Sequence, residues 1–120
     1  MSGGIKFSEK VFWGKAGWVY RTARDGICAE LKSIPGGEEL GTELSAESHA
    51  AQWGQHLDLR ELPENKKKLF FQAVHKYVSA YRKNPSPDSH AASPTGFLVA
   101  LNELEQFTSD AEQANQTLSL

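Results

Sequence analysis

The sequence of 120 residues predicts an α+β domain, in which a three-stranded antiparallel β-meander packs against two or three α-helices. Three observations lead to this fold. The first 34 residues are rich in strand formers, and they contain Asp25-Gly26 between two such runs. Residues 63–83 carry a wide apolar stripe with helical spacing, and residues 94–116 carry another. A small sheet with one apolar face needs a helical layer to cover it.

The meander is expected at about residues 5–34, with strands at roughly 5–13, 18–24 and 27–34. Asp25-Gly26 favours a hairpin turn between the last two strands, because both central residues of a type I′ turn need positive φ. Side chains two positions apart share one face of a strand. The face that lies against the helix at 63–83 would carry either Trp18, Tyr20 and Thr22 or Val19, Ala23 and Cys28, and the larger side chains favour the first set.

The first helix is expected at about 46–57, after a loop over residues 35–45. Ser45 can cap it, and its apolar face would consist of Ala46, Ala50, Trp53 and Leu57. Gly54 can also end this helix early, which would leave residues 55–60 extended. The sequence permits either a helix or an extended segment at residues 55–60.

The main helix is expected at about 63–83. Pro63 is harmless in a first turn, and Glu64 faces the positive end of the helix. Its stripe on the helical wheel consists of Phe70, Ala73, Val74, Tyr77 and Tyr81. Asn84-Pro85-Ser86-Pro87 ends it. The last helix, at about 94–116, would bury Phe97, Ala100, Leu101 and Leu104.

Length and composition indicate a single domain over residues 1–120, with 39% hydrophobic and 23% charged residues. Cys28 is the only cysteine, which excludes an internal disulfide and fits a reducing compartment. No apolar run is long enough for a membrane span, and the N-terminus does not resemble a secretory signal. We therefore expect a cytoplasmic protein with no membrane partner.

The net charge of −2 hides separate blocks of charge. Residues 38–64 hold seven acidic groups and one basic group, residues 65–83 hold six basic groups and no acid, and residues 84–120 hold five acids and no base. Such blocks favour partners with complementary fields. The simpler interpretation is that they are helix faces whose signs cancel inside the fold.

No motif in the sequence indicates a reaction. There is no paired-histidine or Cys-x-x-Cys metal pattern and no phosphate-binding loop, so we expect no catalytic residues, no metal and no cofactor. Cys28 lacks a neighbouring histidine that would activate it. Nucleic acid is not the expected partner, because the chain is net acidic and Tyr77 and Tyr81 lie on the stripe that should be buried.

Residues 57–66, with the sequence LDLRELPENK, and the following LFFQAV at 69–74 resemble a segment of small bacterial immunity proteins. These proteins neutralise the toxins of contact-dependent inhibition and related polymorphic toxin systems. The resemblance implies a bacterial, non-catalytic protein that binds one cognate toxin. Many such toxins are nucleases with basic clefts, which an acidic surface can occupy.

We therefore expect a non-catalytic protein-binding domain that is not an enzyme. The candidate partner-binding residues are six of the seven acids of the 38–64 block, namely Glu38, Glu39, Glu43, Glu47, Asp58 and Glu61. The alternative is a small-ligand-binding or adaptor domain without catalysis. The oligomeric state and the identity of the partner do not follow from the sequence.

Overall fold

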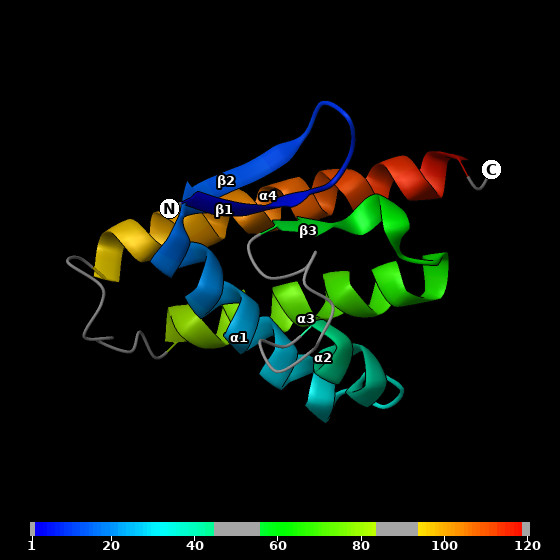
Figure 1. The fold of residues 1–120 in the computed structure, drawn as a ribbon, viewed down its shortest axis with the longest axis horizontal. Coiled ribbons are helices and arrows are strands. Elements are labelled where there is room, and N and C mark those ends of the chain that lie inside the picture. Colours follow the sequence, from blue (N-terminus) through cyan, green and yellow to red (C-terminus); the bar gives the residue numbers. More distant parts are fainter. Residues whose placement is uncertain (1, 45–55, 84–93, 119–120) are drawn as a thin grey trace.

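The computed structural model describes residues 2–44, 56–83 and 94–118, and shows an α+β fold with a small mixed sheet and, in these ranges, four α-helices (Figure 1). The elements in chain order are β1 Ser2–Lys6, β2 Phe12–Ala16, α1 Gly17–Ser33, α2 Glu38–Leu44, β3 His56–Asp58, the 3₁₀ helix η2 Leu59–Glu61, α3 Glu64–Lys83 and α4 Pro94–Leu118. The α+β class is confirmed, but the antiparallel meander and the number of helices are wrong.

The run expected as one strand at 5–13 contains a hairpin instead. β1 and β2 pair antiparallel, with Ile5 opposite Trp13. In the turn between them, the backbone N–H groups of Phe7 and Ser8 donate to the carbonyl of Val11 at 2.9 and 3.3 Å. The Ser8 hydroxyl accepts from the N–H of Val11 at 3.2 Å, which satisfies a further donor of the turn.

The third strand comes from a distant part of the chain. β3 pairs with β1 in parallel, with Ile5 opposite Leu57, so the strand order is β2-β1-β3. The extended reading of residues 56–58 is therefore correct, and a helix that continues to residue 57 is wrong. The rest of the helix expected at 46–57 lies outside the described residues.

The segments expected as strands at 18–24 and 27–34 are the single helix α1. Its buried side chains recur with helical spacing at Tyr20, Ala23, Ile27 and Leu31. Strand propensity is a weak local preference, and burial of this stripe outweighs it. Asp25-Gly26 lies inside this helix and is not a turn. Gly26 lies against the ring of Tyr77, and its lack of a side chain lets α1 approach α3 closely.

Residues 38–44, expected as part of a loop, form the short helix α2. Leu40 is buried, and Gly41 lies so close to the Cys28 carbonyl of α1 that an added Cβ would be 2.9 Å from its oxygen. The glycine that suggested a loop therefore allows two helices to pack closely.

α3 and α4 confirm the two helices expected at 63–83 and 94–116, within one or two residues. The Pro63 carbonyl accepts the first bond of α3 from Lys67 N–H at 2.9 Å. The buried side chains of α3 include Phe71 and Val78, which lie at one edge of the wide apolar stripe, whereas Tyr77 and Tyr81 are half-buried. The stripe is wide because α3 packs against both α1 and α4.

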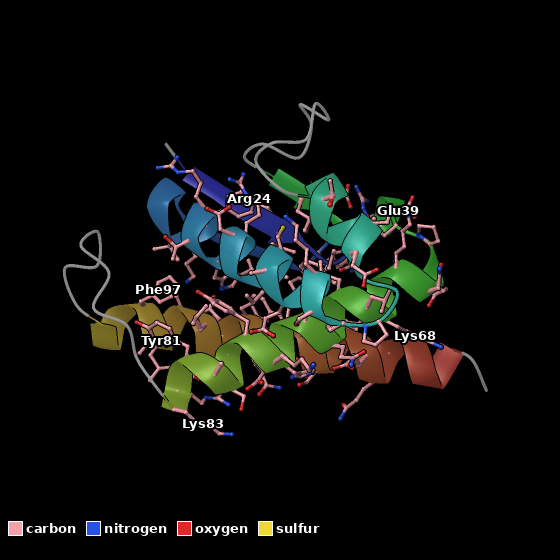
Figure 2. All side chains as sticks on the ribbon, turned by 90° about the horizontal axis from the view of Figure 1, so that it is seen from below. Arg24, Glu39, Lys68, Tyr81, Lys83 and Phe97 are labelled. Carbon is pink, nitrogen blue, oxygen red and sulfur yellow. The ribbon has the colours of Figure 1, made fainter. Side chains whose placement is uncertain are left out.

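The core lies where the inner face of the sheet meets α1, α3 and α4. α1 packs against β1, β2, α2 and α3 (Figure 1), and α3 and α4 run side by side (Figure 2). Trp13 is fully buried, and its Nε1 donates to the Ala100 carbonyl of α4 at 3.0 Å. This bond joins the hairpin to the last helix and satisfies the only polar atom of the indole.

Candidate partner-binding surface

The structure places five of the six candidate acids, and these five belong to two parts of the chain. Glu38, Glu39 and the backbone of Glu43 belong to α2, whereas Asp58 and the backbone of Glu61 belong to β3 and η2. In Figure 1, α2 lies at the bottom of the view, and β3 with η2 lies above it, below the hairpin of β1 and β2. Glu47 lies outside the described residues. The described acids of the block therefore belong to two parts of the chain that are separated in sequence.

Asp58 acts locally and is not available as a free acid. Its carboxylate accepts from the backbone N–H of Arg60 at 3.0 Å, which caps η2. The Arg60 guanidinium donates to both oxygens of the same carboxylate, at 3.0 Å from Nε and 2.8 Å from Nη2. Hydrogen bonds from the Arg60 side chain lower the pKa of Asp58 below its ordinary 3.8. This part of the predicted site is a helix cap with a compensated charge.

Glu38 and Glu39 form the acidic part of the surface that remains. Both are exposed in the first turn of α2, where the helix dipole favours negative charge. Neither forms an ion pair with any other described residue. Buried Leu40 and the close approach of Gly41 hold α2 on α1, so the two carboxylates project from a packed helix. Figure 2 shows Glu39 on this outer side.

Three of the four acids of α4 are paired with basic groups of α3 and β2. Arg82 of α3 lies 2.6 Å from Glu105 of α4, and His75 of α3 lies between Glu105 and Glu112. Lys15 of β2 pairs with Glu103 at 3.2 Å. The simpler interpretation of the charge blocks, that their signs cancel inside the fold, therefore describes these residues.

A row of lysines on α3 is left over after this pairing. Lys68, Lys76 and Lys83 are exposed, and none forms an ion pair within the part of the chain that the structure describes. Figure 2 shows Lys68 and Lys83 at opposite ends of α3. The sequence indicated a basic block here, but only the structure shows which of its members face solvent.

The nucleophilic side chains of α1 are buried. Burial raises the pKa of the Cys28 thiol to about 11 and that of the Tyr20 hydroxyl to about 12, so both are protonated at neutral pH. The Arg24 guanidinium lies 5.6 Å from the centre of the Tyr20 ring. These three residues line a cavity of about 10 Å³ together with Ile5, Ile27, Leu57 and Phe70. This volume admits about one water molecule, so this particular cavity is too small for a ligand.

Among the described residues, no group of three or more histidine, cysteine or acidic side chains could hold a metal ion. Within the same ranges, no helix is long and apolar enough to cross a membrane. Comparisons with protein-family models, with curated proteins and with solved structures found no match to this chain. The case for function therefore rests on the charged surfaces and on the sequence resemblance.

Proposed function

We propose that this chain is a non-catalytic protein-binding domain that recognises a basic partner through Glu38 and Glu39 of α2. The partner we propose is a toxin encoded beside it, such as a nuclease with a basic cleft, which makes the chain an immunity protein. One observation carries the proposal: two adjacent exposed carboxylates have no compensating cation in the described structure, whereas most acids of α4 are paired.

Electrostatic reasoning gives this surface its role. Adjacent carboxylates on a packed helix create a local negative field, and such a field accelerates the encounter with a positively charged partner. The two side chains are exposed, so they contribute mainly to the association rate and less to the lifetime of the complex. An inhibitor of this kind needs a stable scaffold and a complementary surface, and it needs no catalytic group.

The test is the association rate with the product of the neighbouring gene, measured at two salt concentrations. Glu38→Lys with Glu39→Lys should slow association by at least about tenfold at low salt, and the difference should shrink at high salt. The matched control is Glu9→Lys with Asp110→Lys. It changes the net charge equally, at two exposed acids outside α2, one in the turn between β1 and β2 and one on α4. Equal slowing by both pairs would mean that net charge matters and α2 does not.

The lysine row of α3 supports a second candidate, binding of an acidic partner or a nucleic acid. Lys68→Glu with Lys76→Glu separates the two surfaces, because it reverses two exposed lysines that pair with no described residue. If this variant abolishes binding and the α2 variant does not, the proposed face is wrong. If nucleic acid binds with a steep salt dependence and no protein partner does, the immunity proposal fails.

A further inference from the structure

His75 occupies an unusual position between two carboxylates of the neighbouring helix. Its Nδ1 lies 3.0 Å from Oε2 of Glu105, and its Nε2 lies 2.6 Å from Oε1 of Glu112. Both glutamates belong to α4, two helical turns apart, so a single ring of α3 connects two successive sections of α4. The ring is about a third exposed, and Glu105 is less exposed still, at 20%.

The number of protons on the ring follows from this geometry. A neutral imidazole carries one N–H donor and one lone pair, so it can donate to only one of two carboxylates. The other nitrogen would then present its lone pair to a carboxylate oxygen at hydrogen-bond distance, which is repulsive. An imidazolium donates from both nitrogens and satisfies both contacts.

The charged groups around the ring favour the same state. Glu105 and Glu112 face it from α4, and Arg82 of its own helix reaches the second oxygen of Glu105 at 2.6 Å. Glu105 therefore keeps a cationic partner if His75 loses a proton. Glu112 does not, because His75 is its only ion-pair partner among the described residues.

We propose that His75 is an imidazolium clamp between α3 and α4, and that the association of these two helices is controlled by its proton. When the pH rises and the ring gives one proton to solvent, one of the two contacts to α4 loses its hydrogen bond. The contact between the helices then weakens, and Glu112 is left without its cation.

The sign of the pH dependence follows from two shifts. Burial lowers the pKa of His75, but the hydrogen bonds to Glu112 and Glu105 outweigh it and raise the pKa above 6.5. Its contribution to stability is therefore complete below pH 6.5 and is lost as the pH rises through the folded-state pKa. Burial raises the pKa of Glu105, but His75 and Arg82 outweigh it and lower the pKa below 4.5. The clamp is therefore strongest at about pH 4.5–6.5.

The first test is an NMR titration of the imidazole nitrogens of the whole chain, with His75→Gln used to assign the His75 signals. We expect both nitrogens of His75 to be protonated at pH 6.5, with a pKa above that value. Glu112→Gln should shift this pKa downward, because it removes the charge at Nε2. A folded-state pKa of His75 at or below 6.5 would overturn the proposal. This pKa is measured on the wild-type chain, and His75→Gln serves only to assign the signals.

The matched control is Asp110→Asn. It removes the same charge from the same helix, two residues from Glu112, at an exposed side chain that accepts from Gln106 and not from His75. It should leave the His75 pKa nearly unchanged, and equal shifts in both variants would mean that the ring senses only overall charge. A second readout is the urea midpoint at pH 6 and pH 8.5. Wild type should lose more stability between these values than His75→Gln, and equal losses would refute the clamp.

Discussion

Gly26 lies in the middle of α1, and replacing it with alanine tests the packing of α1 on α3. In a helix interior this substitution normally stabilises by roughly 0.5–1 kcal/mol, because alanine loses less backbone entropy than glycine. Here an added Cβ would lie 2.6 and 2.7 Å from Cζ and Cδ1 of the Tyr77 ring. Cε1 of the ring would be closer still, and because atoms in ordinary contact are at least 3.4 Å apart, the ring would have to move by more than 1 Å.

The two effects oppose each other, and their magnitudes decide the sign. Overpacking of a well-packed contact costs about 1–3 kcal/mol. The gain in helix propensity offsets up to about 1 kcal/mol of this cost. We therefore expect Gly26→Ala to destabilise the protein by up to about 2.5 kcal/mol. Tyr77 is half-buried, so its ring has room to turn outward, and such a movement reduces the cost of the substitution.

The assay is urea unfolding of a double-mutant cycle with Tyr77→Ala. In the Tyr77→Ala background the space next to Gly26 is open, so Gly26→Ala should become neutral or stabilising there. A stabilising effect of Gly26→Ala in the wild-type background would refute the close contact between α1 and α3. As a control, the helical circular dichroism signal should be retained in both backgrounds, since both substitutions place alanine within a helix.

Two further predictions concern the core and the cap of η2. Phe70→Ala should lower the free energy of unfolding in urea by about 3–5 kcal/mol, because Phe70 is 2% exposed and already borders a small cavity. A decrease below about 1 kcal/mol would mean that Phe70 does not belong to the core. Asp58→Ala should cost about 0.5–2 kcal/mol at neutral pH through loss of the cap. Because the pKa of Asp58 is lowered, its contribution is present above pH 3.8 and disappears as the pH falls through the folded-state pKa. The difference between wild type and Asp58→Ala should therefore shrink in acid, and a constant difference would contradict the charged pair with Arg60.

The sequence determined the parts of this fold that carry strong periodic and terminal signals. α3 has Pro63 before it, a wide apolar stripe and an acidic first turn, and its bounds were predicted closely. α4 likewise buries Phe97, Leu101 and Leu104 as its spacing predicts. These helices were predictable because burial and local preference agree over many residues.

The tertiary structure alone decided the first third of the chain. In α1 the local preference of Trp18-Val19-Tyr20 and Asp25-Gly26 favours strands and a turn, whereas the buried stripe favours a helix. Which preference wins depends on α3, whose Tyr77 occupies the space that Gly26 leaves open. β3 also depends on a distant partner, because its parallel pairing with β1 joins residues about 50 positions apart.

The same distinction holds for the candidate surface. The sequence located the blocks of charge, but it could not show which charges compensate each other, since that depends on which helices lie side by side. Packing of α3 against α4 pairs His75 and Arg82 with glutamates, and a local turn pairs Asp58 with Arg60. Among the described residues Glu38 and Glu39 pair with no cation, and α2 packs on α1 through the face that carries Leu40.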